Sequence, residues 1–310
     1  MKTGWIIFWS LLSVFVLLVI SLSIIFSLFQ NNDLENSSFA FGKTTVAKIY
    51  VNGPIVGDSS STLFGEQLAS SSELRAQIKM AKDDRSVSAI MFEINSPGGS
   101  AVASREIADA ILNVDKPTAS LIREIGASGA YWIASSTDYI VADELSITGS
   151  IGVLASSLNF AGFIEDYNIS YQQINGGKHK DIGSPFRDMT DEERKLIQGK
   201  IDSMHSVFIR EVAFNRGISY EEVERAASGI FYLGSEAEKL NLVDELGNED
   251  AVVKYLSVVL AVPKESILFK QYKRKLSFIE LISGAFSDFA FKIGEGMSRG
   301  LLESGLVVKA

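Results

Sequence analysis

Residues 87–112 read VSAIMFEINSPGGSAVASREIADAIL, and this stretch decides the fold class. Its first eight residues, Val87 to Ile94, form an apolar run that is typical of a buried strand. A turn with two glycines follows at 95–99, and from Ser100 to Leu112 the apolar residues recur at helical spacing. A buried strand, a glycine turn and a helix in this order predict an α/β unit.

The same order of elements recurs along the rest of the chain. We expect strands at 46–51, 118–122 and 139–142, and helices at 72–82, 128–135 and 190–215, followed by shorter helices. Right-handed crossovers between such strands produce a parallel sheet with helices packed against it. The pattern therefore predicts an α/β domain.

The N-terminus predicts a membrane anchor. Residues 5–29 read WIIFWSLLSVFVLLVISLSIIFSLF, and Lys2 is the one charged side chain before Asp33. A helix that rises about 1.5 Å per residue can cross a hydrocarbon core of about 30 Å with this length. The run is longer than the core of a cleaved signal peptide and has no Ala-x-Ala site. With Lys2 before it and Asp33 and Glu35 after it, the positive-inside rule predicts a single-pass protein of the cell membrane, with a cytoplasmic N-terminus and an extracytoplasmic domain.

We divide the chain into four segments. Residues 1–32 are the cytoplasmic tip and transmembrane anchor, 33–45 a polar linker, 46–262 the main domain and 263–310 a C-terminal amphipathic extension. The extension is locally basic at first and then mixes apolar runs with Gly and Ser. We expect it to lie on a surface or between subunits.

Composition excludes several classes of function. The formal net charge is −9 and no basic block is present, which excludes a nucleic-acid partner. The chain has no cysteine and two histidines, so thiolate catalysis, cysteine zinc sites and histidine-rich metal centres are excluded. We therefore expect no metal and no cofactor, and chemistry based on hydroxyls, carboxylates, amines or the backbone.

Four short motifs are candidates for that chemistry. The glycine pair of NSPGGS, residues 95–100, would leave backbone N–H groups free for an anion or an oxyanion. In GASGAYW, residues 126–132, small residues surround Ser128 at the start of a predicted helix, as in a loosened nucleophile elbow. Each motif also has a plain structural interpretation, a strand-to-helix turn for the first and a helix N-cap for the second.

The other two motifs are a hydroxyl-rich turn and a loop with lysines. They read SITGSIGV at 146–153 and GGKHKDIGSP at 176–185. A lysine in a loop is usually a solvated charge with a pKa of about 10.4. Burial against apolar surface can lower that pKa by several units, and the neutral amine can then accept a proton from a serine.

Taken together and in this order, NSPGG, ASGAYWIA, SITGSIGV and KHKDIGSPFRDMT resemble the signal peptide peptidase A family of serine peptidases. The resemblance continues through GSEA at 234–237 and LVDELG at 242–247, so it covers about residues 46–253. It implies the fold of the Clp protease and crotonase families, a repeated ββα superhelix, here preceded by one transmembrane helix. One such unit resembles the short, single-domain members.

The family's roles transfer to particular residues of this chain. The resemblance implies Ser128 as the nucleophile, Lys180 as the general base and Ser150 as a hydrogen-bond partner of the lysine amine. It also implies an oxyanion hole formed by the backbone of Gly98, Gly99 and Gly129. Lys178 and His179 are rival bases, but the motif matches at the lysine before Asp-Ile. Ala130 and Trp132 depart from the family's usual glycine and tyrosine and could narrow the substrate groove.

The resemblance implies a membrane-anchored serine endopeptidase that degrades cleaved signal peptides and other peptides near the bilayer. Its partners would be peptide substrates, the bilayer, and copies of itself in a homo-oligomer with shared active sites. A crotonase-like acyl-CoA enzyme is an alternative, although it would need glutamates that face the thioester and has little reason for an anchor. A non-catalytic membrane scaffold derived from the peptidase is the other, and the presence of both Ser128 and Lys180 argues against it.

Overall fold

The computed structural model describes residues 42–58 and 68–272, together with a few helical positions between Trp5 and Ser21. The chain divides into two units, one of which is Thr44–Lys273. Within the described residues, no helix is both long and apolar enough to cross a bilayer. Most of the predicted anchor at 5–29 lies outside these residues, as do most of the predicted linker and the extension from residue 273 onward.

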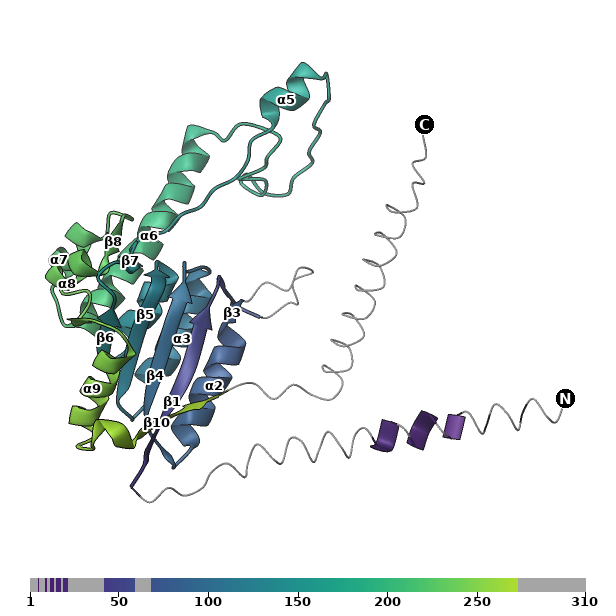
Figure 1. The fold of residues 1–310 in the computed structure, drawn as a ribbon. Helices are drawn as coiled ribbons and strands as arrows, with labels where there is room; N and C mark the ends of the chain where they lie inside the picture. The colour runs from purple at the N-terminus through teal and green to yellow at the C-terminus, as the bar shows by residue number, and fades with distance from the viewer. Residues whose placement is uncertain are drawn as a thin grey trace, which may run out of the picture. The chain divides into compact units, whose positions relative to one another are not determined.

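A mostly parallel sheet forms the centre of the unit Thr44–Lys273 (Figure 1). Its strands follow the order β10-β1-β4-β5-β6-β9, with β7 beside β5 and β8 beside β7. Only the β7–β8 pair of this described sheet is antiparallel. The strands are β1 (Thr44–Asn52), β4 (Val87–Ser96), β5 (Thr118–Ala127), β6 (Tyr139–Ala142), β7 (Ile147–Gly149), β8 (Phe231–Leu233), β9 (Glu245–Leu246) and β10 (Ile267–Gln271). A separate parallel pair contains β2 (Ile55–Val56) and β3 (Ala69–Ser70). The predicted α/β class is confirmed.

Helices cover both faces of this sheet. In β4, Ile90, Phe92 and Ile94 belong to one apolar cluster, whereas Ala89 and Met91 belong to another. The first cluster includes residues of α2 (Ser71–Asp83), α3 (Ala101–Leu112), α4 (Gly129–Ser135) and α6 (Asp191–Arg216), and the second includes residues of α9 (Glu249–Val259). Because β4 is buried on both faces, its sequence is a continuous apolar run rather than an alternating one. Each large aliphatic side chain buried there stabilises the fold by about 1.5–3 kcal/mol.

The remaining helices are short. They are α5 (Ala161–Asp166), α7 (Tyr220–Ala226), α8 (Gly234–Lys239) and a 3₁₀ turn at Lys264–Ser266. Helix α5 belongs to residues 153–190, a segment that also contains the predicted lysine motif at 176–185 and that we call the arm. The arm leaves the sheet after β7, extends away from it and returns at α6 (Figure 1).

Candidate active site

Ser128 lies at the junction between β5 and α4 in an uncommon backbone conformation. Its φ is 53° and its ψ is −125°, a combination that non-glycine residues adopt where the surrounding structure holds a strained turn. The Ser128 N–H donates to Gly149 O at 2.8 Å, and the Trp132 N–H donates to Ser128 O at 3.1 Å. The Ser128 side chain makes no capping hydrogen bond to α4, so the plain N-cap interpretation is wrong. This is the geometry of a nucleophile elbow, which exposes the serine oxygen.

The glycine pair after β4 lies directly against this serine. Gly98 has a φ of +96°, and a Cβ on it would come within 2.8 Å of Gly129 N and 2.9 Å of the Ser128 Cβ. A Cβ on Gly99 would lie 2.2 Å from Ile55 O. Both glycines are therefore required by close backbone contact, and the first and second motifs form one site.

Two backbone N–H groups at this contact have no acceptor among the described residues. The Gly98 N–H donates to Ser96 Oγ at 3.2 Å. By contrast, the N–H groups of Gly99 and Gly129 donate to no acceptor in the described part of the chain. Of the three predicted oxyanion donors, Gly99 and Gly129 can thus receive a developing negative charge without first breaking a hydrogen bond.

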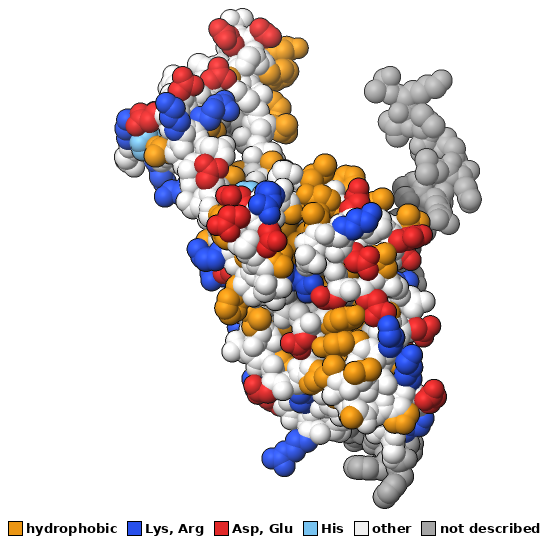
Figure 2. Space-filling model, turned by 90° about the vertical axis from the view of Figure 1, so that its left-hand side faces the viewer, with side chains coloured by type: hydrophobic (Ala, Val, Ile, Leu, Met, Phe, Trp, Pro, Cys, Tyr) orange, Lys and Arg blue, Asp and Glu red, His pale blue; other side chains and the backbone are white. Residues whose placement is uncertain are grey.

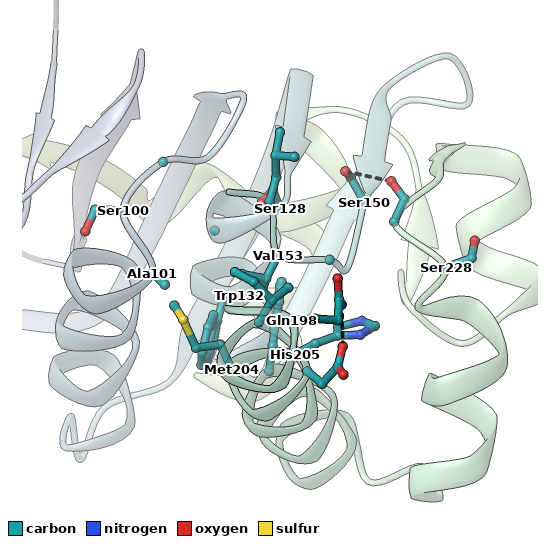
Figure 3. Close-up of a pocket in the computed structure, with 18 residues that line it drawn as sticks. Ser100, Ala101, Ser128, Trp132, Ser150, Val153, Gln198, Met204, His205 and Ser228 are labelled. Atoms are coloured by element: carbon teal, nitrogen blue, oxygen red, sulfur yellow. Dashed lines mark hydrogen bonds between the residues drawn. The ribbon is translucent and has the colours of Figure 1, made fainter. Parts of the chain in front are cut away.

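A cavity of about 660 Å³ opens beside Ser128 (Figure 3). One wall is apolar and includes Trp132 and Phe208, whose rings stack with centroids 4.3 Å apart. The Trp132 indole N–H donates to Glu211 at 3.0 Å, which fixes the ring plane. The polar side chains of the cavity include Ser150, Gln198, Asp202 and His205. The apolar wall can hold an apolar side chain next to the serine.

Ser150 faces the same cavity as Ser128. Strands β5 and β7 pair so that Ala127 lies opposite Gly149, which brings the residues that follow them together. The Ser150 hydroxyl donates to Gly229 O at 3.1 Å, marked by a dashed line in Figure 3. A hydroxyl has one donor, so the lone pairs of Ser150 Oγ remain able to accept a hydrogen bond.

Lys180 does not line the cavity. Its side chain is exposed in a turn of the arm, where its backbone N–H donates to Gly177 O at 3.3 Å. The rival bases lie in the same turn: Lys178 donates to both carboxylate oxygens of Glu192 at 2.7 Å, and His179 Nε2 lies 3.8 Å from Glu192. One chain by itself therefore brings Ser128, Ser150 and the glycine turn together, but not the lysine.

His205 is a residue of the cavity that the sequence analysis did not select. It lies on α6, one turn before Phe208, and its Nε2 is 3.2 Å from Ile151 O. Helical spacing places His205 and Phe208 on one face of α6. Nothing in the sequence pattern indicates that this face meets the serine.

The described residues contain no group of three or more His, Cys, Asp or Glu side chains that could hold a metal ion. This arrangement offers a partly exposed serine that lines a cavity with an apolar wall, and two backbone N–H groups that are free among the described residues. These are the parts that acyl transfer needs, apart from a base.

The comparisons with known proteins agree with an acyl-transfer site of this kind. The model of peptidase family S49 matches residues 110–262, which include Ser128, Ser150 and Lys180. A protein of Methanocaldococcus jannaschii, named as a candidate protease, is 34% identical over 301 residues, 95% of this chain and 90% of the relative. The chain belongs to peptidase family S49. It is a protease of the signal peptide peptidase A group, and the resemblance inferred from the four motifs is confirmed.

Other similar proteins differ in how much of their length the chain covers. A protein of Enterococcus faecium, named as a candidate signal peptide peptidase, is 32% identical over 230 residues, 72% of this chain and 67% of the relative. Protease 4 of Haemophilus influenzae is 31% identical over 211 residues, 67% of this chain and 34% of the relative. Among solved structures, a mutant of the 1510-N membrane-bound stomatin-specific protease has a TM-score of 0.49 and 17% identity, and the match covers 75% of this chain and 99% of that one.

Proposed function

We propose that this S49 peptidase is a membrane-anchored serine endopeptidase in which Ser128 is the nucleophile and Lys180 of a neighbouring copy is the general base. The observation that carries the proposal is the contact between the strained Ser128 turn and the free N–H groups of Gly99 and Gly129. A nucleophile that lines a cavity beside two preorganised donors serves acyl transfer. Membership of a peptidase family favours peptides over thioesters as the acyl donor.

The reaction proceeds in two steps. Ser128 Oγ attacks the peptide carbonyl carbon as its proton passes to the neutral Lys180 amine, and the oxyanion accepts hydrogen bonds from Gly99 and Gly129. The C–N bond then breaks, and the leaving amine takes the proton from the Lys180 ammonium. In the second step, a water molecule gives a proton to the Lys180 amine and attacks the acyl carbon. The ester C–O bond then breaks, which releases the acid, and the Lys180 ammonium returns its proton to Ser128 Oγ.

A second copy of the chain supplies the base because Lys180 lies in the arm, outside the cavity of its own chain. The arm carries apolar side chains that are exposed in one chain: Leu154, Leu158, Phe163, Tyr167, Ile169 and Ile174. Figure 2 shows hydrophobic side chains gathered on one side of the projecting part. A partner copy would bury this surface and bring Lys180 to Ser128 in the same step.

Ser150 orients the incoming amine. Its hydroxyl hydrogen already donates to Gly229 O, so its oxygen can accept an N–H of Lys180. That contact leaves the amine lone pair available for the proton of Ser128. Ser150 is therefore a positioning residue for the base.

The substrates proposed are signal-peptide remnants and other apolar peptides near the bilayer. The support is the apolar cavity wall beside Ser128, the name of the similar Enterococcus faecium protein, and the apolar run at residues 5–29. We also propose that the parallel sheet belongs to the Clp and crotonase type. The domain would act outside the cytoplasm.

Mixed assemblies of two inactive variants test this function. Ser128→Ala retains the base and Lys180→Ala retains the nucleophile, so each alone should lose nearly all peptidase activity. When the two full-length variants are unfolded together and reassembled, random neighbours would restore about a quarter of the sites. Separately reassembled samples, mixed afterwards, are the control. Activity that stays absent in mixed assemblies of normal size would contradict a shared site, and full activity of Lys180→Ala would contradict the lysine base.

A further inference from the structure

The turn that carries Lys180 is tied to the start of α6 by one arginine. Arg187 Nε donates to Asp181, the residue after Lys180, at 2.5 Å. The other two guanidinium nitrogens donate to the two carboxylate oxygens of Glu193 at 2.9 and 2.6 Å. A planar guanidinium that bridges two carboxylates fixes both distance and orientation between them.

This network is shielded within an otherwise exposed arm. The side chains of Arg187, Asp181 and Glu193 are 25%, 11% and 6% exposed. Hydrogen bonds from Arg187 lower the pKa of Asp181 and of Glu193 to about 2, so both carboxylates stay ionised at neutral pH. The bridge is therefore intact across the range in which a peptidase works.

Glu193 is in turn held rigidly by the first turn of α6. Its carboxylate accepts the Thr190 N–H at 3.0 Å, and its own N–H donates to Thr190 Oγ1 at 3.2 Å, a capping box. Three turns later, the same helix supplies His205 and Phe208 to the cavity beside Ser128. The Lys180 turn is thus connected to a rigid helix rather than to a free loop.

The network fixes the backbone beside Lys180 and leaves its amine unused. Lys178 pairs with Glu192, and both side chains are largely exposed, at 69% and 58%. Lys180 pairs with no carboxylate of the described residues. Arg187 holds the turn through shielded contacts, Lys178 is occupied by an exposed ion pair, and Lys180 alone among these three residues is available to another chain.

We propose that Arg187 is a positioning residue for the catalytic lysine, because its bridge between Asp181 and Glu193 fixes the Lys180 turn to the first turn of α6. The proposal rests on the proposed function, in which Lys180 is the base. A base displaced by about 1 Å can cost about 100-fold in rate. Loss of the bridge should therefore slow the chemical step and leave peptide binding in the Ser128 cavity nearly unchanged.

Arg187→Gln in the full-length assembled protein is the main test. We expect kcat for a fluorogenic peptide to fall between about 10-fold and 100-fold, with KM within about twofold. Methylguanidine should restore part of the lost kcat by occupying the vacated position. Lys178→Gln, which breaks the exposed pair in the same turn, is the matched control and should keep kcat within about twofold. Asp181→Asn combined with Arg187→Gln should lose about as much as the single variant, because both remove the same bridge.

The outcomes separate this proposal from the proposed function. Wild-type kcat and KM for Arg187→Gln, with Lys180→Ala inactive, would overturn the positioning role and leave the dyad intact. Full activity of Lys180→Ala would remove the proposed function itself. If Arg187→Gln fails to assemble, Arg187→Lys is the deciding variant, because it keeps the positive charge but cannot form the planar bridge between Asp181 and Glu193. A wild-type kcat for assembled Arg187→Lys would then overturn the proposal, and a loss of about 10-fold or more, rescued by methylguanidine, would support it.

Discussion

Gly98 lies so close to Ser128 that a Cβ on Gly98 would be 2.9 Å from the serine Cβ. The contact joins two motifs that are thirty positions apart in the sequence. Strands β4 and β5 are parallel neighbours, and Ser96 pairs with Gly126 at the edge where both strands end. Because carboxyl ends of parallel strands share one edge of a sheet, the turns that follow them meet.

This contact predicts the effect of a single methyl group. Gly98→Ala should destabilise the fold by about 1–3 kcal/mol, because φ is +96° and the new Cβ meets backbone atoms. It should also reduce labelling of Ser128 by a fluorophosphonate at least about tenfold, because the oxyanion donors would shift. Thermal unfolding and labelling rates measure the two effects.

Gly217→Ala is the control for the Gly98 variant. Gly217 also has a positive φ, +63°, at the end of α6, but a Cβ there meets nothing within 4 Å. It should cost about 1 kcal/mol in stability and leave labelling unchanged. Normal labelling of Gly98→Ala would show that the close contact does not matter for the chemistry.

Neither histidine should be required for peptidase activity. His205 lines the cavity, but its Nε2 already contacts Ile151 O, and His179 lies in the arm. We expect His205→Gln and His179→Ala to keep kcat/KM within about threefold of the wild type, whereas Lys180→Ala loses nearly all of it. If His205→Gln were as damaging as Ser128→Ala, an imidazole in the chain's own cavity would be the base.

Ser150→Ala should weaken the peptidase without unfolding it. Removal of the hydroxyl leaves the Lys180 amine without an acceptor, so kcat should fall by roughly 10-fold to 100-fold. Ser228→Ala, another serine of the same cavity, is the control and should be near wild type. Circular dichroism checks the fold. Equal activity of the two variants would remove Ser150 from the site.

Activity should rise with pH, because only the neutral lysine amine accepts the serine proton. The Asp181 and Glu193 carboxyls do not contribute to this rise. Their pKa values are lowered from ordinary values of 3.8 and 4.5 to about 2, so their stabilising contacts are complete above pH 4.5 and are lost as pH falls toward 2. Steady-state kcat measured against pH tests the rise in activity. Helix content followed over the same pH range tests the loss of the Asp181 and Glu193 contacts. A flat profile from mildly acid to alkaline pH would contradict a lysine base.

The domain should be outside the cytoplasm, because Lys2 precedes the apolar run and Asp33 follows it. Protease added to spheroplasts should degrade the domain and spare cytoplasmic markers. A domain that stays protected until lysis would have the opposite topology.

Local patterns in the sequence determined much of this protein's secondary structure and its family. The apolar run at 87–94 predicted the buried strand β4, and the pattern at 190–215 predicted the long helix α6, which a capping box of Thr190 and Glu193 begins. The order of four short motifs was sufficient for the family. Such signals can be read from sequence because a strand, a cap or a glycine turn depends on residues within a few positions of one another.

Only the tertiary structure decided which of these residues meet. The register of β4 and β5 set Gly98 against Ser128 and left the N–H groups of Gly99 and Gly129 free. The packing of α6 brought His205 into the cavity, and the direction of the arm carried Lys180 away from it. Contacts between distant segments depend on how whole strands and helices pack, and that packing sums many weak contacts along the entire chain, so no single motif specifies it.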